Sequence, residues 1–300
     1  MGPLWGIDLG GTKIEGIILE DSENPVALRR LRVPTEADQG YEHIIEQIAK
    51  LIETLAAETG IRPSQLGIGH PGTLDPKSGL IKNANTTCLN GQPFNTDLEA
   101  VLGIPVKLAN DANCFAVAEA NIGAAHEVCP GAEVVFGVIM GTGVGGGVVV
   151  RGKVINGRHG IGGEWGHNFL DTSGGPCYCG RIGCVETLIS GPGLQRYYTS
   201  LTGVELPLKE IIRRARAYED TAAEATMQRM IQFFGKGIAT VINTIDPDVI
   251  VIGGGLGQID ELYTDGVAEA SKWVFNPRLE TIFVKPKLGD SAGVYGAALL

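Results

Sequence analysis

This chain lacks the features that mark membrane proteins and nucleic-acid-binding proteins. Its 300 residues carry a formal net charge of −10, and they contain no run of lysine or arginine that could neutralise a phosphate backbone. The longest nearly uncharged stretch, 134–150, contains six glycines and predicts a hairpin rather than a membrane span. The N-terminus has no basic start followed by an apolar run, so no secretory signal is indicated. We therefore expect a cytoplasmic protein with neither a membrane nor a nucleic acid as partner.

The cysteines do not indicate a disulfide framework. Three of the six lie between residues 177 and 184, and the others are scattered along the chain. With one nearby histidine they offer one imidazole and three thiols, a ligand set that suits tetrahedral Zn²⁺; the four residues are His167, Cys177, Cys179 and Cys184. Because this set fills all four positions, a metal-bound water has no place, and we expect a structural zinc. A thiol cluster without metal is the alternative.

Glycine, with 44 residues, is abundant and concentrates in two segments. Segments 6–19 and 137–150 align without a gap, with glycines coinciding at 6/137, 10/141 and 16/147. Each predicts a strand, a glycine turn and a second strand, and such a turn lets backbone N–H groups surround an anion. Two ordinary tight hairpins are the alternative for either segment alone. The pair suggests two related halves that face one ligand with several phosphates.

The remaining sequence alternates between strand and helix patterns, as in α/β proteins. Apolar spacing predicts helices near 40–58, 111–120 and 222–245, and buried strands near 66–69, 104–108 and 249–252. A chain of this length exceeds what one compact domain usually needs, so two lobes are expected.

Several motifs, taken in chain order, resemble one family. They are Asp8-Leu-Gly-Gly-Thr-Lys13, Asn110-Asp111-Ala-Asn113, Gly141-Thr-Gly143, Glu164-Trp-Gly-His167, the cysteine run that ends at Glu186, and Ile252-Gly-Gly-Gly255. Together they resemble the ROK family of bacterial sugar kinases and repressors, from residue 5 to Leu300. Segments 82–94 and 289–294 look most like its fructokinase/mannokinase branch.

This resemblance implies a fold and an activity. The fold is an α/β, actin-like and RNase H-like, two-lobed ATPase fold with duplicated halves and a structural zinc site. The expected small lobe is 1–109, with a C-terminal helix at about 290–300 packing back on it, and the expected large lobe is 110–289 with the zinc motif. The implied ligands are a hexose, ATP and Mg²⁺, and the implied assembly is a homodimer.

The expected activity is transfer of the γ-phosphoryl of ATP to the C6 hydroxyl of a hexose, D-fructose first, with mannose or glucose possible. An N-acetylhexosamine kinase or a glucokinase is the alternative acceptor class. A sugar-responsive transcriptional regulator is the alternative of another kind. Regulators of this family carry a helix-turn-helix domain ahead of the first phosphate motif, which here starts at Asp8, and the acidic charge disfavours DNA.

Two aspartates have the roles that phosphoryl transfer requires. Asp111 follows a strand and precedes a helix, so it could be the general base or merely the helix N-cap, and the resemblance favours catalysis. Asn110 could hydrogen-bond a sugar hydroxyl or provide the same cap. Asp8, at the end of an apolar strand, suits a water-mediated Mg²⁺ near the β- and γ-phosphates.

Glycine-rich turns are expected to bind ATP. The residues expected at the nucleotide are Asp8, Gly10, Gly11, Thr12, Lys13, Gly141, Thr142, Gly143, Gly253, Gly254 and Gly255. Lys13 could equally be a solvated strand charge.

The expected hexose site centres on two carboxylates and an imidazole. Glu164 and Glu186 would accept hydrogen bonds from hydroxyls, while His167 would use one ring nitrogen for zinc and the other for the sugar. Gly72 and Asn85 match family positions near the sugar. The zinc would then hold the segment that presents the two glutamates.

Overall fold

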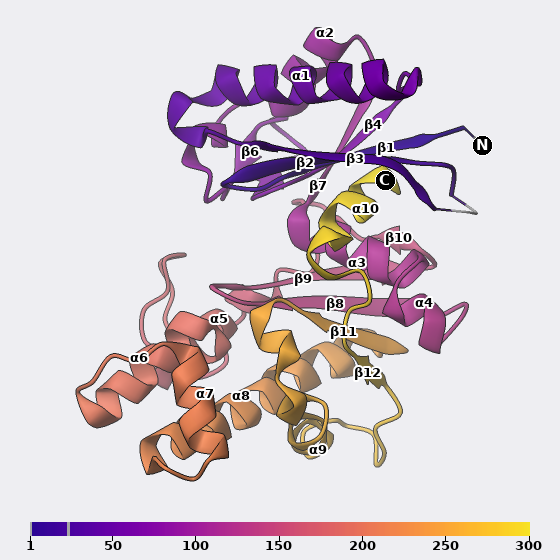
Figure 1. Cartoon of the computed structure of the whole chain (residues 1–300). Helices are drawn as coiled ribbons and strands as arrows, with labels where there is room; N and C mark the ends of the chain where they lie inside the picture. Colours follow the sequence, from indigo (N-terminus) through magenta and orange to yellow (C-terminus); the bar gives the residue numbers. More distant parts are fainter. Residues whose placement is uncertain (1, 23–24) are drawn as a thin grey trace. The chain divides into compact units, whose positions relative to one another are not determined.

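The computed structural model describes residues 2–22 and 25–300 as an α/β protein with two five-stranded sheets (Figure 1). The strands are β1 (Leu4–Leu9), β2 (Lys13–Leu19), β3 (Ala27–Pro34), β4 (Leu66–His70), β5 (Thr73–Leu74), β6 (Ile81–Lys82), β7 (Val106–Asn110), β8 (Val134–Met140), β9 (Val144–Val150), β10 (Lys153–Val154), β11 (Val249–Gly253) and β12 (Ile282–Val284). The helices are α1 (Tyr41–Thr59), α2 (Phe94–Leu102), α3 (Asp111–Asn121), α4 (Ala124–Val128), α5 (Val185–Ile189), α6 (Gly191–Thr202), α7 (Leu208–Arg216), α8 (Thr221–Ile245), α9 (Asp265–Ser271) and α10 (Ala292–Ala298).

The two sheets repeat one topology. The first has the strand order β3-β2-β1-β4-β7, and the second has β10-β9-β8-β11-β12. In each, a hairpin is followed by two parallel strands, since β4 pairs in parallel with β1 and β7, and β11 does so with β8 and β12. β2 and β9 begin and end at the same offset of 131 residues that the glycine pattern gave. The predicted duplication of an actin-like α/β fold is thus confirmed.

Packing groups the chain into two compact units. Unit 1 comprises Met1–Val128, Gly147–Gly163 and Lys287–Leu300, and unit 2 comprises Cys129–Gly146 and Glu164–Pro286. The lobe boundaries expected from the sequence, 1–109 and 110–289, stay a prediction. None of the helices in residues 2–22 and 25–300 has the length and apolarity needed to cross a bilayer.

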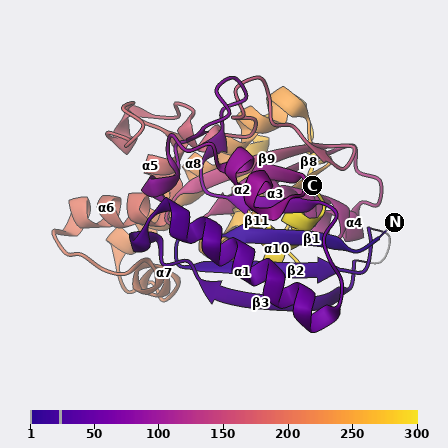
Figure 2. The same cartoon turned by 90° about the horizontal axis from the view of Figure 1, so that it is seen from above.

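In unit 1 the first sheet is covered on both faces. The view from above shows α1 lying across β1–β3 (Figure 2), and its apolar side chains join the sheet in the core of the unit. On the opposite face α10 packs against β1, β4 and α3. This approach is very close, because a Cβ added to Gly67 of β4 would lie 1.8 Å from the carbonyl oxygen of Ala297, and one added to Gly296 would lie 1.8 Å from that of Cys114. Only glycine fits at these two positions.

A buried carboxylate fixes the chain just ahead of α10. Glu119 of α3 has no exposed surface, and it accepts backbone N–H groups from Ala124, Lys287 and Leu288 at 2.7–3.1 Å. These three donors satisfy a charge that would otherwise be costly to bury. The segment that enters α10 is therefore fastened to α3.

In unit 2 the long helix α8 is the centre of the helical layer. Helices α5, α6, α7 and α9 each pack against it. Its N-terminus is capped by Asp220, whose Oδ1 accepts the N–H groups of Ala222 and Ala223. Its buried face includes Met227, Met230 and Phe234, as the apolar spacing predicts.

Candidate active site

The expected residues of unit 1 gather at one edge of the first sheet. Strands β1, β4 and β7 are parallel neighbours, so their carboxyl ends meet at the same edge, where α/β sheets bind ligands. Asp8 lies near the end of β1, Gly72 just beyond β4, and Asn110 at the end of β7, directly before Asp111.

Asn110 provides the helix cap. Its Oδ1 accepts the N–H of Ala112 at 2.9 Å, and its Nδ2 donates to the carbonyl oxygen of Gly72 at 2.9 Å. Asp111, the first residue of α3, also accepts the N–H of Ala112, at 2.8 Å through Oδ1. The capping role is therefore present in the structure, and Asn110 also links the start of α3 to the loop after β4. The roles of Asp111 as base and of Asn110 at the sugar stay predictions.

The surroundings of Asp111 favour its neutral form more than water does. Although the residue is solvent-accessible, the protein around its carboxylate raises its pKa by desolvation, while hydrogen bonds from Ala112 and Asn110 act in the opposite direction. A carboxylate with a raised pKa is a stronger base than a free aspartate, as proton acceptance from a hydroxyl requires.

The pKa of Asp8 is affected by the charge of Asp111. Desolvation, followed by the charges of Asp111 and Glu15, raises the pKa of Asp8 to about 6, against the weaker opposing effect of Lys13 and Arg32. A Cβ added to Gly293 would come within 2.9–3.2 Å of the Asp8 carboxylate, so α10 closes one side of it. A hard divalent cation beside Asp8 would offset the repulsion that Asp111 exerts on its charge, so the residues present fit Mg²⁺.

Glu15 was missed by the sequence reasoning. It is fully buried in β2, opposite Asp8 in the register, and it forms ion pairs with Arg32 (Nε–Oε2 2.8 Å) and Arg30 (Nε–Oε1 3.2 Å) of β3. Nothing in the sequence identified the two arginines of β3 as its partners.

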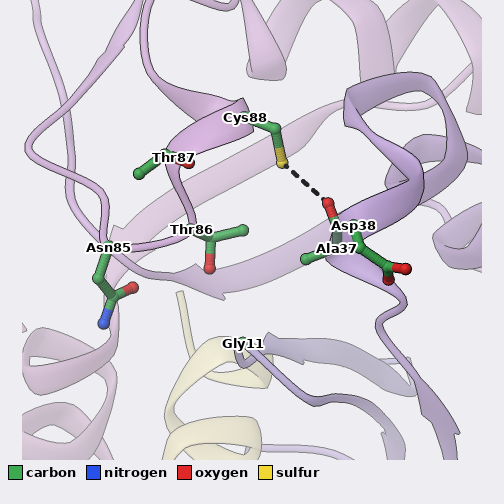
Figure 3. Close-up of a pocket in the computed structure, with 7 residues that line it drawn as sticks. All are labelled: Gly11, Ala37, Asp38, Asn85, Thr86, Thr87 and Cys88. Atoms are coloured by element: carbon green, nitrogen blue, oxygen red, sulfur yellow. Dashed lines mark hydrogen bonds between the residues drawn. The ribbon is translucent and has the colours of Figure 1, made fainter.

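Unit 1 contains a pocket of about 440 Å³. It is lined both by Gly11, which is expected to bind phosphate, and by Asn85, which is expected to bind the sugar. Its lining residues, drawn in Figure 3, are Gly11, Ala37, Asp38, Asn85, Thr86, Thr87 and Cys88. On one side the thiol of Cys88 donates to the carbonyl oxygen of Ala37 at 3.8 Å. Gly11 belongs to the turn between β1 and β2, and Asn85 belongs to the loop after β6.

The loop that carries Asn85 is held by its own side chains. The side chain of Asn90 forms two hydrogen bonds with the backbone of Ala84. Its Oδ1 accepts the N–H of Ala84 and its Nδ2 donates to the carbonyl oxygen of Ala84, both at 2.8 Å. Gly72 has a φ of 77°, and a Cβ there would lie 2.6 Å from the backbone of Lys82 and Ala84. Glycine at this position lets the loop lie against the end of β4.

In unit 2 three expected segments meet at the start of β9. Glu186, in α5, accepts the N–H of Val144 at 3.0 Å through Oε2, and a Cβ on Gly143 would lie 2.6 Å from the same oxygen. Trp165 donates its ring N–H to the carbonyl oxygen of Gly145 at 3.1 Å. The turn 141–143, the segment 164–167 and Glu186 therefore form one cluster.

The other expected phosphate segment of this unit lies close by. Gly254, just past β11, has a φ of 78°, and a Cβ there would lie 2.3 Å from the carbonyl oxygen of Met140. Because β8 and β11 are parallel neighbours, Gly253–Gly255 and Gly141–Gly143 lie at the same sheet edge.

The thiols and the imidazole form a compact group. The ligand atoms of His167, Cys177, Cys179 and Cys184 all lie within 4.8 Å of one another. The distance is 3.6 Å from Cys177 Sγ to His167 Nδ1 and 3.6 Å from Cys179 Sγ to Cys184 Sγ. Tetrahedral zinc with Zn–S bonds of about 2.3 Å sets its ligands about 3.8 Å apart, so the group fits this metal. The cysteines are all free, as expected.

The geometry assigns the two ring nitrogens of His167. Nδ1 faces the thiols, while Nε2 lies 3.0 Å from the hydroxyl of Tyr178. A metal on Nδ1 leaves the proton on Nε2, which then donates to a hydroxyl oxygen.

Tyr178 was also missed by the sequence reasoning. Desolvation, followed by the charges of Glu186, Cys177 and Glu164, raises the pKa of its hydroxyl to about 12. Tyr178 is thus hydrogen-bonded to His167, and its hydroxyl is affected by the charges of both glutamates.

Comparison with known proteins agrees with this architecture. The sequence profile of the ROK family matches residues 4–300. The chain is 36% identical over 310 residues to an N-acetyl-D-glucosamine kinase of Pectobacterium atrosepticum, covering 99% of this chain and 98% of the relative.

Two solved structures extend the comparison. The crystal structure of the ROK hexokinase from Thermus thermophilus superposes with a TM-score of 0.89 at 34% identity, covering 99% of this chain and 97% of that one. A ROK family glucokinase from Streptomyces griseus, crystallised with glucose and AMPPNP, gives a TM-score of 0.74 at 28% identity, covering 99% and 98%. The chain belongs to the ROK family.

Proposed function

We propose that this protein is an ATP-dependent sugar kinase whose acceptor is N-acetyl-D-glucosamine. The observation that supports the acceptor is the 36% identity, over nearly the full length of both chains, to a relative named for that activity. The observation that supports phosphoryl transfer is the gathering of Asp8, Asp111 and the first glycine turn at one sheet edge.

Asp111 is proposed as the general base. It would accept the proton of the C6 hydroxyl as the bond to phosphorus forms, and its raised pKa suits that step. Asp8 is proposed to hold Mg²⁺, which neutralises charge on the phosphates of ATP. Three segments are proposed to bind those phosphates through their backbone N–H groups: Gly10–Lys13, Gly141–Gly143 and Gly253–Gly255.

The other carboxylates are proposed to bind hydroxyl groups of the sugar. Glu164 and Glu186 would accept hydrogen bonds from sugar hydroxyls, and His167 would donate one from Nε2. The side-chain amides of Asn85 and Asn110 and the backbone near Gly72 are proposed as further contacts to the sugar. Zinc on the His/Cys group would act structurally, because its ligands fill the tetrahedron and lie on the segment that carries both glutamates.

Fructose, the acceptor first expected from the sequence, is less well supported than the alternative of an N-acetylhexosamine. The relatives and structures above bear the names of N-acetyl-D-glucosamine kinase, hexokinase and glucokinase. The acceptor pocket of such an enzyme must accommodate an acetamido group, and discrimination between hexoses depends on pocket shape rather than on a motif. A homodimer stays a prediction.

A coupled ADP-release assay tests this proposal. Initial rates with ATP and Mg²⁺ would be compared for N-acetylglucosamine, N-acetylmannosamine, glucose, mannose and fructose. We expect the highest kcat/KM with N-acetylglucosamine. A higher kcat/KM with fructose would favour the fructokinase assignment expected from the sequence. If none of the five sugars led to ADP release, the sugar-kinase assignment would be wrong.

A further inference from the structure

We propose that Thr35 is a positioning residue that aims the first phosphate turn at its anion. This inference rests on the proposed kinase function for its consequence, but the geometry stands on its own. Thr35 follows β3 and has no exposed surface. It contributes no group to any of the sites expected from the sequence.

Thr35 binds the glycine turn at two points. Its hydroxyl donates to the carbonyl oxygen of Gly10 at 2.7 Å, and its backbone N–H donates to the carbonyl oxygen of Thr12 at 3.0 Å. The turn is closed separately by the N–H of Gly10, which donates to the carbonyl oxygen of Lys13 at 2.9 Å. Two of the carbonyl groups in the turn are therefore held by a residue outside it.

These bonds determine where the N–H groups point. In a trans peptide the C=O of one residue and the N–H of the next are antiparallel across the same plane. Holding the carbonyl of Gly10 toward Thr35 therefore directs the N–H of Gly11 away from Thr35. Gly11 lines the pocket of unit 1 (Figure 3). The same bonds turn the negative carbonyl oxygens away from the side where a phosphate would bind.

The second half of the chain shows the same arrangement made by a different donor. Gly141 corresponds to Gly10 in the gapless alignment of the two glycine segments. Its carbonyl oxygen accepts the N–H of Gly191, at the start of α6, at 2.8 Å. In both turns, then, the carbonyl of the first glycine is held from outside. In unit 1 the holding group is a side-chain hydroxyl, which can be removed by substitution.

The test removes the hydroxyl of Thr35 and measures the affinities for nucleotide and for sugar separately. Thr35→Val keeps the branched shape and the backbone N–H but loses the donor, and Thr35→Ser keeps the donor. We expect Thr35→Val to raise the Kd for AMPPNP in calorimetry, and the KM for ATP in the kinase assay, by about 5- to 30-fold, as loss of one buried hydrogen bond does. The KM for the sugar should change less than about twofold, and Thr35→Ser should restore nucleotide affinity.

Several outcomes would overturn the inference. An unchanged AMPPNP affinity in Thr35→Val would show that the hydroxyl does not aim the turn. Equal losses of nucleotide and sugar affinity, or equal losses in the Val and Ser variants, would indicate a general structural role. If Thr35→Val does not fold, as circular dichroism would show, Thr35→Ala applies the same test without the added methyl group. Because AMPPNP binding needs no turnover, it tests Thr35 even if the wild-type protein phosphorylates none of the sugars.

Discussion

Replacing Asp8 by asparagine should stabilise the ligand-free protein, and the gain should grow with pH. Asp8 is only partly exposed, and desolvation with the charges of Asp111 and Glu15 raises its pKa from 3.8 to about 6. The folded protein therefore keeps a proton on Asp8 over a pH range in which the unfolded chain has released it. Folding stability contributed by this group is greatest below pH 4 and falls as the pH rises toward 6.

The magnitude follows from the size of the shift. A rise of about two pKa units corresponds to about 3 kcal/mol of stability lost between low pH and neutral pH. Asp8→Asn carries no charge at any pH and escapes this loss. Its gain in the free energy of unfolding over wild type should be about 2 kcal/mol larger at pH 7.5 than at pH 4.5.

Urea unfolding at these two pH values, without nucleotide or divalent cation, measures the difference. Asp290→Asn, which removes one aspartate charge from an exposed position of the same unit, is the matched control. Asp111→Asn removes one of the charges that act on Asp8, so the pH-dependent gain of Asp8→Asn should shrink in that background. A gain of equal size at pH 4.5 and pH 7.5 would refute the reasoning.

Three further predictions concern the site and the fold. Asp111→Ala should fold and bind sugar but lose about 10²- to 10⁴-fold in kcat, as loss of a positioned base does, and near-normal turnover would leave Asp111 with a capping role only. Cys179→Ser should lower the zinc content measured by mass spectrometry and weaken sugar binding with it, whereas full sugar affinity in a zinc-depleted variant would disprove the structural role of the metal. Gly67→Ala should lower the free energy of unfolding by about 3 kcal/mol or more, because its Cβ would overlap the carbonyl oxygen of Ala297, while Gly11→Ala, whose nearest contact is 3.9 Å away, should unfold near the wild-type midpoint.

Much of the fold could be predicted because local sequence patterns determine its strands and helices. The paired glycine segments gave both hairpins at the same offset, and α1 and α8 follow from apolar residues at helical spacing. The His/Cys group could be predicted for a related reason, since its ligands are close in sequence and chemically distinctive.

The features that were missed depend on contacts between residues far apart in the chain. The hydroxyl of Thr35 binds the backbone carbonyl group of Gly10, 25 residues away, and a carbonyl group cannot be recognised in the sequence. Tyr178 stands between Cys177 and Cys179 in the sequence, but its contact with His167 needs the folded loop. Gly67 and Gly296 lie inside a regular strand and a regular helix, and the need for glycine at both positions comes from the packing of α10 against β4 and α3. Local pattern predicts elements, whereas close approach between elements requires the structure.

The central claim is that the C6 hydroxyl of an N-acetylhexosamine accepts a phosphoryl group with Asp111 as base. Phosphorus NMR of the wild-type protein and of Asp111→Ala, each with ATP, Mg²⁺ and N-acetylglucosamine, tests it most directly. The account predicts a sugar 6-phosphate resonance that grows with the loss of ATP in the wild type and is nearly absent in the variant. Equal product from both proteins, or phosphate released from ATP without a sugar ester, would contradict it.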